Sequence, residues 1–170
     1  LFALGQTSRV EVPAAFVYAG SAIGVALAGD LVTVFVFWEL MAVGSTLVLW
    51  SEGSPDAWRA ARLYLMVHLL GGVVLFAGIT GHVVDTGSIA FTRMAPDSIA
   101  HWLILIGFLI NAGAPPLSAW LPDAYPEASY SGTVFLSAFT TKTAVYVLIR
   151  GFPGTELLIW VGLAMVFYGI

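Results

Sequence analysis

Long apolar runs alternate with short polar segments along the whole chain. A polar segment over 1–12 comes first and is expected to be a loop. A bilayer-spanning helix needs about 20 consecutive apolar residues. The runs predict membrane-spanning helices over residues 14–28, 31–50, 57–83, 98–121 and 131–150, with a sixth beginning in 155–170. The expected fold is an all-α membrane protein, a bundle of about six transmembrane helices.

The fourth apolar run contains strong helix breakers in its middle. Its first part, 98–112, holds 15 residues, which form about 22 Å of helix at about 1.5 Å per residue. The apolar core of a bilayer is about 30 Å thick, so residues 114–121 have to complete the crossing. Gly113, Pro115 and Pro116 therefore predict a broken helix. Irregular backbone survives in a membrane only where protein or water satisfies its polar groups, and transporters build ion sites at such breaks.

The composition agrees with a membrane protein and excludes several classes of site. The chain is 59% hydrophobic and 9% charged, whereas soluble domains carry about 25% charged residues. It has no cysteine, which excludes disulfide bonds, thiolate metal sites and cysteine-ligated iron–sulfur clusters. Glycine-rich phosphate loops, dinucleotide fingerprints and basic aromatic patches are also absent from the sequence. We expect no cofactor, no metal, no nucleic-acid partner and no enzyme activity in the chain by itself.

The two ends of the chain resemble the interior of a longer protein. The sequence has no initiator methionine, and no basic region before an apolar run marks a signal peptide. Its last residue, Ile170, lies inside an apolar run. We expect the chain to be one part of a longer polypeptide.

Two charged residues fall in the middle of predicted spans, Glu39 and Lys142. Each is disfavoured at the bilayer centre by about 2.5–3.5 kcal/mol. Glu39 lies 11 residues before Trp50, and Lys142 lies 11 residues after Ser131, so both are about 16 Å deep. His68 is within one helical turn of that level. The three side chains are therefore predicted to form one layer.

A layer of this kind can relay protons. A lysine that gains and loses a carboxylate neighbour binds and releases a proton, because pairing and burial act oppositely on its charge. The alternative is a static buried ion pair between Glu39 and Lys142 that only fixes helix packing. For His68 the alternative is a hydrogen bond to a neighbouring helix. Both interpretations remain open at this point.

Polar side chains near these groups are candidates for lining a path. A stripe of hydroxyl residues runs beside Lys142 at helical spacing and leaves room for water. It comprises Thr133, Ser137, Thr140 and Thr141. Asn111, directly before the break, either caps exposed backbone groups or lines the channel.

Other aromatic and histidine side chains lie near the predicted ends of spans. Trp102, Trp120 and Tyr130 are expected to be interfacial anchors, since amphipathic rings gather at the headgroup level. His82 and His101 lie at span ends and are expected to be interfacial as well.

Three segments resemble a known family. They are FWELM in the second span, AGAPPLSAWLPDAYPEAS around the break, and FLSAFTTKTAVYVLIR in the fifth span. Together they resemble the proton-conducting membrane subunits shared by Mrp-type cation/proton antiporters and NADH:quinone oxidoreductase (complex I), a module also used by membrane-bound hydrogenases. The detail is most similar to D-type subunits of the multisubunit Na⁺/H⁺ antiporter.

The resemblance implies a fold and an assembly. In the family, a bundle of five spans with one broken helix repeats with inverted topology, and each repeat holds half of a proton path. Residues 13–150 would form one such repeat, and 155–170 would open the second. The implied partners are protons, other membrane subunits of a multisubunit complex and the lipid bilayer of an energy-conserving membrane, the bacterial plasma membrane. The resemblance leaves open whether Na⁺ is carried.

The resemblance also implies roles for individual residues. Glu39 matches the paired glutamate of the family, and Lys142 matches the lysine of the span after the broken helix. The family usually has a second lysine just before the kink, where this chain has Asn111. Glu39 would then pair with Lys142, interact with His68, or remain protonated. His68 falls in the span where some members carry a titratable relay residue.

Three functions follow as competing expectations. The first is proton translocation in a multisubunit monovalent cation (Na⁺)/proton antiporter. The second is a proton-pumping membrane-arm subunit of NADH:quinone oxidoreductase or a membrane-bound hydrogenase, with the redox centres on other chains. The third is a non-conducting structural paralogue, which follows if Asn111 interrupts the path.

Overall fold

The computed structural model describes residues 8–118 and 120–168, and the regular elements of this part of the chain are helices joined by turns and loops. Its only extended pairing is an isolated bridge between Asp30 and Ala90. The helices are α1 (Glu11–Leu27), α2 (Leu31–Trp50), α3 (Pro55–Thr86), α4 (Ile99–Ala112), α5 (Trp120–Ala124), α6 (Tyr130–Ala138), α7 (Thr140–Gly151) and α8 (Glu156–Tyr168). The predicted all-α fold is confirmed. Most of the predicted loop 1–12 and the last two residues of 155–170 lie outside the described residues.

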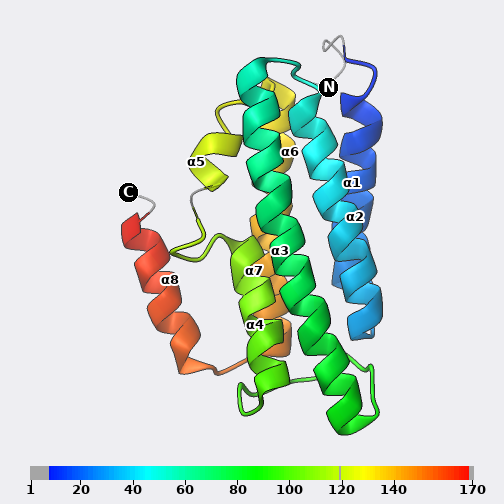
Figure 1. Ribbon diagram of the computed structural model, residues 1–170, viewed down its shortest axis with the longest axis vertical. Helices are drawn as coiled ribbons and strands as arrows, with labels where there is room; N and C mark the ends of the chain where they lie inside the picture. Colours follow the sequence, from blue (N-terminus) through cyan, green and yellow to red (C-terminus); the bar gives the residue numbers. More distant parts are fainter. Residues whose placement is uncertain (1–7, 119, 169–170) are drawn as a thin grey trace.

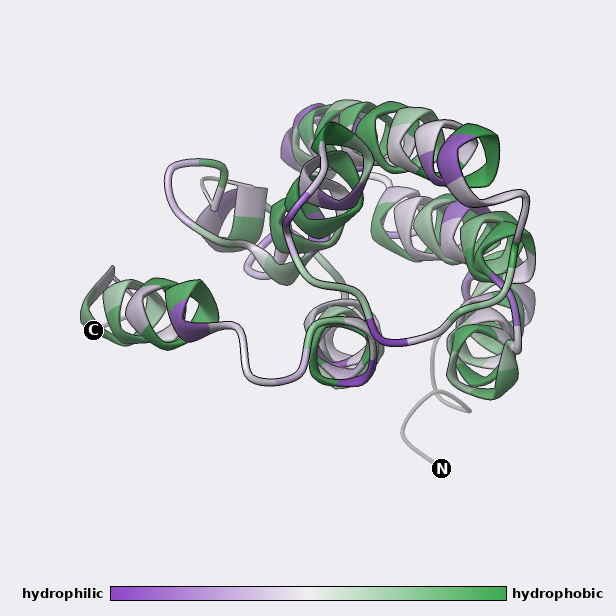
Figure 2. Cartoon of the chain, turned by 90° about the horizontal axis from the view of Figure 1, so that it is seen from below, coloured by the Kyte–Doolittle hydropathy of each residue, from purple (hydrophilic) through white to green (hydrophobic). Residues whose placement is uncertain are grey.

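Three of these stretches are long and apolar enough to cross a bilayer: α2, α3 and the stretch Tyr130–Gly151 that contains α6 and α7. Three shorter helices, α1, α4 and α8, are also apolar. Hydrophobic residues cover most of each helix, including faces turned away from the bundle (Figure 2). Large side chains such as Phe16 and Leu27 are exposed there. Apolar side chains on the outside as well as in the core are what a lipid environment requires.

Helix α3 is the longest helix of the described chain and packs against α2, α4 and α5 (Figure 1). Its 32 residues span about 48 Å, which is more than the predicted span of 57–83. Small residues let its neighbours approach closely. A Cβ on Gly78 would lie 2.6 Å from the backbone nitrogen of Ile104, and one on Gly107 would lie 2.8 Å from the Cβ of Leu75. Helices α3 and α4 therefore pack almost backbone to backbone.

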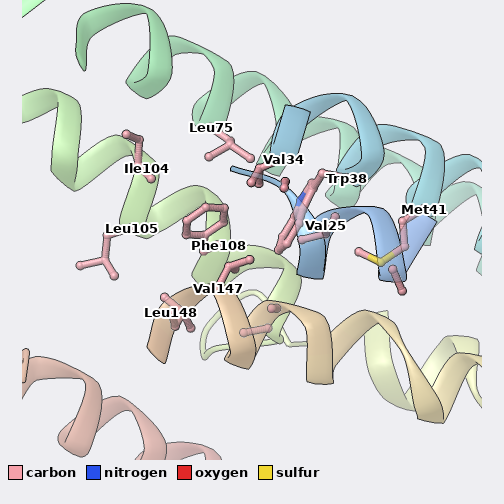
Figure 3. Packing of buried hydrophobic residues seen from close by; sticks show 14 of the residues in the cluster. Val25, Val34, Trp38, Met41, Leu75, Ile104, Leu105, Phe108, Val147 and Leu148 are labelled. Atoms are coloured by element: carbon pink, nitrogen blue, oxygen red, sulfur yellow. The ribbon is translucent and has the colours of Figure 1, made fainter. Parts of the chain in front are cut away.

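An apolar core runs through the bundle. Figure 3 shows buried side chains from α1, α2, α3, α4 and α7 in mutual contact. The rings of Trp38 and Phe108 meet there at a tilt of 52°, with their centroids 5.2 Å apart. Burial of large apolar side chains contributes about 1.5–3 kcal/mol each, so this core ties the five helices together.

The fourth span is interrupted where the sequence predicts it. Helix α4 ends at Ala112, and Gly113 adopts the left-handed conformation with φ of +76°, which glycine reaches without steric cost. Residues 113–118 are not helical, and α5 begins at Trp120. The broken fourth helix is therefore confirmed.

The fifth span contains a second break that the sequence analysis did not predict. It was expected as one helix over 131–150, whereas the structure ends α6 at Ala138 and starts α7 at Thr140. Phe139 lies between them with φ −113° and ψ −62°. No glycine or proline occurs at this point, so the break has a tertiary cause.

Helix α8 stands apart from the other helices in both views (Figures 1 and 2). None of its described residues is buried. An apolar groove of about 220 Å³ separates it from α4 and α7, lined by side chains that include Leu109, Val145 and Val161.

The turn between α1 and α2 yields a stability prediction. Asp30 caps α2, accepting the backbone N–H of Thr33 at 2.8 Å and the Thr33 hydroxyl at 2.7 Å. These bonds, the backbone bond first, hold the pKa of the Asp30 carboxyl below its ordinary value. Because the folded pKa is lowered, the ionised cap stabilises the fold at neutral pH. That contribution is lost as the pH falls below the unfolded value of about 3.9 and through the lower folded value.

We expect Asp30→Ala to destabilise the protein by about 0.5–2 kcal/mol, the usual effect of removing a side-chain cap. Thermal unfolding in detergent at neutral pH measures this change. Asp30→Asn keeps an acceptor oxygen without a charge, so it should lose less stability and lack the acid-dependent component. An unfolding midpoint of Asp30→Ala equal to that of the unaltered protein would contradict the role of the cap.

Candidate functional site

Glu39 lies against the backbone of α3 at Gly72. A Cβ placed on Gly72 would be 2.1 Å from Oε1 of Glu39 and 2.8 Å from its Cδ. The carboxyl group therefore occupies the space that any larger residue at position 72 would fill. Oε1 is buried and has no hydrogen-bond partner among the described residues. The structure thus holds a carboxyl group inside the bundle with one oxygen free.

Asn111 lies against the adjacent glycine. A Cβ on Gly71 would be 2.8 Å from Oδ1 of Asn111. The Asn111 side chain is fully buried, and neither its oxygen nor its nitrogen is paired within the described chain. The N–H groups of Gly113 and Ala114 instead donate to carbonyls within α4. The capping interpretation of Asn111 is therefore wrong, because the backbone already closes the helix end.

His68 lies one turn before these glycines on the same buried face of α3. Its side chain is 1% exposed. Nδ1 is 2.8 Å from the carbonyl oxygen of Tyr64. A carbonyl can only accept, so Nδ1 carries the hydrogen, and Nε2 of the neutral ring has a free lone pair. Nε2 has no partner in the part of the chain that the structure describes.

Trp120 closes the site on the side of the broken helix. It was expected to be an interfacial anchor, and this expectation is wrong, because it is 1% exposed. Its ring meets His68 edge-on at 4.7 Å and Tyr64 at 5.1 Å between centroids. After the break, α5 packs back against α3 and inserts Trp120 into the bundle. The hydropathy of a tryptophan is compatible with both positions, so the sequence could not distinguish a buried Trp120 from one at the lipid headgroups.

Lys142 lies on a different face from Glu39 and His68. It is the third residue of α7, its side chain is exposed, and its Nζ donates to the hydroxyl of Thr141 at 3.3 Å. Among residues 8–118 and 120–168, the ion pairs join Asp56 with Arg59 and Asp97 with His101. The structure therefore does not bring Lys142 to Glu39. It presents the amine outside the bundle of α1 to α4.

The predicted hydroxyl stripe is divided by the break at Phe139. Thr140 is buried, Thr141 is half-buried and Ser137 is exposed. The spacing that placed them on one face assumes a continuous helix, which the structure does not have. Only Thr140 faces the interior fully.

Three hydroxyl residues that the sequence analysis did not select join Thr140. Tyr64 donates to Oγ of Ser45 at 2.8 Å and lies 3.0 Å from Oγ1 of Thr140. The Tyr18 hydroxyl in turn bonds to Oγ1 of Thr140. We refer to Tyr18, Thr140, Tyr64 and Ser45 as the hydroxyl chain. The signal for Tyr64 was its position four residues before His68, on the same helix face.

The polar groups gather in one half of the bundle. Beyond Gly72, the buried face of α3 continues with Leu75, Gly78 and Ile79 against Ile104 and Phe108. The next polar side chain among the buried residues of α3 is His82. The described residues contain no group of three histidine or acidic side chains able to hold a metal. The arrangement places a carboxyl group with a free oxygen and an imidazole with a free lone pair at adjacent turns of α3.

Comparison with known proteins gives one family. The family model described as "NADH:quinone oxidoreductase/Mrp antiporter, TM" matches residues 28–169. The chain is 32% identical to NADH-quinone oxidoreductase subunit M of Pseudomonas aeruginosa, over 88% of this chain and 35% of that protein. It is also 32% identical to a probable K⁺/H⁺ antiporter subunit of Rhizobium meliloti, over 86% of this chain and 16% of that protein.

The fold is similar to solved structures as well. The Mrp complex from Dietzia sp. DQ12-45-1b contains a chain that superposes with a TM-score of 0.81 and 28% identity, over 95% of this chain and 34% of that one. A membrane-bound sulfane sulfur reductase, an archaeal respiratory complex, contains a chain with a TM-score of 0.73 and 26% identity, over 79% of this chain and 29% of that one. The present chain thus spans 35% of subunit M and 34% of the Mrp-complex chain.

The contact between Glu39 and Gly72 yields a second prediction. Gly72→Ala places a methyl group where the Glu39 carboxyl lies, and overpacking of this kind costs about 1–3 kcal/mol. We expect a lower thermal unfolding midpoint for Gly72→Ala. Gly20→Ala is the matched control, because a Cβ there meets nothing within 4 Å.

The double variant Glu39→Ala/Gly72→Ala should recover most of the loss caused by Gly72→Ala, since the carboxyl group that clashes is gone. Unfolding midpoints measured for the four members of this cycle give the coupling directly. Strictly additive losses would show that the two side chains do not share this space.

Proposed function

Because the chain belongs to the family of membrane subunits shared by NADH:quinone oxidoreductase and Mrp antiporters, we propose that it forms part of a proton path through a membrane. The complete protein would act as one component of a multisubunit monovalent cation/proton antiporter in an energy-conserving membrane. Its partners would be other membrane subunits, as in the complexes that its relatives form.

The carrying observation is the carboxyl group of Glu39. It packs onto Gly72 with one oxygen unpaired, and His68, whose Nε2 is also unpaired, lies four residues before this glycine on α3. An ionisable group in the middle of a membrane span is disfavoured by about 2.5–3.5 kcal/mol. A purely structural role does not need this group, because an apolar side chain would pack there at lower cost. Proton binding explains its presence.

His68 would be the partner of Glu39 within this chain. Asn111, the other polar side chain at this level, cannot carry a charge. Nε2 of His68 can accept a proton, and Nδ1 is held by the Tyr64 carbonyl at 2.8 Å, which fixes the ring. Asn111 would line the path and orient water with its amide.

Lys142 would act at the boundary of the described bundle. Its amine is exposed on α7, and the chain covers only 34% of the Mrp-complex chain that it matches. We propose that Lys142 passes protons between this bundle and segments of the complete protein outside it. The charge of Lys142 would then respond to groups on those segments.

The antiporter and the redox complex differ in their energy source. The fit over 95% of the chain to a chain of an Mrp complex favours the antiporter. The match to NADH-quinone oxidoreductase subunit M supports the alternative, a proton-pumping membrane-arm subunit. In either case, the chain would move protons and leave redox chemistry to other subunits.

Reconstituted vesicles distinguish the two. The purified complete assembly should acidify or alkalinise the lumen when a Na⁺ or K⁺ gradient is imposed, without an electron donor. Proton movement that requires electron transfer to a quinone would favour the redox complex. Absence of proton movement under both conditions would identify a non-conducting paralogue.

We expect Glu39→Gln and Lys142→Ala each to reduce proton flux of the complete assembly by about tenfold or more, which equals a rise of about 1.4 kcal/mol in the barrier. Each variant removes a proton-binding group and keeps the helices. A pH-sensitive dye inside proteoliposomes measures the flux. Glu52→Gln is the control, because Glu52 is exposed in a loop, where it accepts the N–H of Ser54. Unchanged flux in both test variants would remove the proposed path.

A further inference from the structure

The break between α6 and α7 occurs at one hydrogen bond. In a continuous α-helix the N–H of Thr140 would donate to the carbonyl of Leu136, four residues earlier. In the structure the Tyr18 hydroxyl lies between these two groups. It accepts the N–H of Thr140 at 2.8 Å and lies 3.5 Å from the carbonyl oxygen of Leu136. Insertion of a side chain into the helical ladder is a known cause of a sharp kink.

The inserted hydroxyl satisfies groups that have no access to water. Tyr18 and Leu136 are both completely buried. A buried backbone group without a partner costs about 1–3 kcal/mol, so a break here requires a donor and an acceptor from another helix. Tyr18 on α1 supplies both. Tyr125 adds a second donor to the Leu136 carbonyl at 3.2 Å.

The hydroxyl chain keeps this arrangement in two proton patterns. In one pattern Tyr64 donates to Thr140 in place of Ser45, Thr140 donates to Tyr18, and Tyr18 donates to the Leu136 carbonyl. In the other, Tyr18 donates to Thr140, Thr140 donates to Tyr64, and Tyr64 donates to Ser45. The N–H of Thr140 remains bonded to Tyr18 in both. The break is therefore held whichever way the hydroxyl groups point.

The break also determines where Lys142 lies. Helix α7 begins at Thr140, and Lys142 is its third residue. A continuous helix would rotate α7 about its axis relative to α6 and move the lysine to another face. The same hydroxyl chain reaches Tyr64, whose ring stacks on His68 with centroids 3.9 Å apart. Tyr18 therefore links the rotation of α7, which carries Lys142, to α3, which carries His68.

We propose that Tyr18 is a positioning residue for Lys142, which holds the α6–α7 break open by inserting its hydroxyl between Thr140 and Leu136. This inference rests on the proposed role of Lys142 in proton movement. Tyr18 touches no substrate in this role and acts through the backbone of Thr140. The phenol hydroxyl is the required group, and the ring provides its reach from α1.

The test uses the complete assembly and a reporter at position 142. These 170 residues contain no cysteine, so Lys142→Cys introduces the one thiol within them, and its rate of labelling by a maleimide, above the background of the assembly that retains Lys142, reports its surroundings. We expect Tyr18→Phe to change that rate by about threefold or more, because the break closes or frays without the hydroxyl. Tyr146→Phe is the control. Tyr146 also links α7 to α1, donating to the Ala26 carbonyl at 2.9 Å, but it lies outside the break.

Proton flux provides the second measurement, in the protein that retains Lys142. We expect Tyr18→Phe and Thr140→Val each to lower the flux by about fivefold. Thr140→Ser should restore it to near the unaltered level, because serine keeps the hydroxyl that valine lacks. A defect of general packing would not be relieved by the smaller serine.

The outcomes separate this inference from the proposed function. Unchanged flux in Lys142→Ala would overturn the proposed function and this inference with it. If Lys142→Ala abolishes flux, an unchanged labelling rate in Tyr18→Phe, or unchanged flux in that variant, would overturn the positioning role alone. Equal flux in Thr140→Val and Thr140→Ser would also overturn it.

Discussion

The contact between the Glu39 carboxyl and the backbone at Gly72 is the interaction on which the centre of the bundle depends. Two adjacent glycines leave α3 without side chains at one level, and α2 and α4 each place a polar side chain there. Asn111 is fully buried, and Glu39 is half-buried with its Oε1 atom enclosed by protein. Inside a membrane every polar group needs a partner in the protein or a water. Because Glu39 and Asn111 lie against adjacent glycines of α3, both need a polar partner or a water at the same level of the bundle.

The interior is divided into two unlike halves. On one side of Gly72 lie His68, Tyr64 and the hydroxyl chain, whereas on the other side the core contains apolar side chains packed against glycines. A charge is accommodated more easily in the polar half, because the low dielectric constant of the apolar half makes a charge there costly. The proton path that we propose would therefore reach the middle of the described bundle from the polar side. A path that continues to the other side of the membrane would require polar groups outside the apolar half.

Much of this architecture could be predicted from the sequence, because lipid allows only hydrogen-bonded helices and apolar runs mark them. The break at Gly113 and the shared face of His68 and Gly72 follow from local chemistry and helical spacing. The direction of Lys142 could not be predicted, since it depends on a bond between Tyr18 and Thr140, which are 122 residues apart. Trp120 was misplaced for a similar reason: its hydropathy suits an interface, but the turn after the break carries it inward.

The glycine-lined seam between α3 and α4 has a mechanical consequence. With Gly78 against the backbone of Ile104 and Gly107 against Leu75, a shift of either helix along the other would drive a side chain into main-chain atoms. The two helices therefore form a rigid pair in which neither helix can slide along the other or rotate against it. Any rearrangement of the bundle therefore has to take place around this pair of helices, in the short α5 and in the two-part stretch of α6 and α7. Trp120 of α5 and Thr140 of α7 both contact Tyr64 of α3, one through its ring and the other through its hydroxyl group.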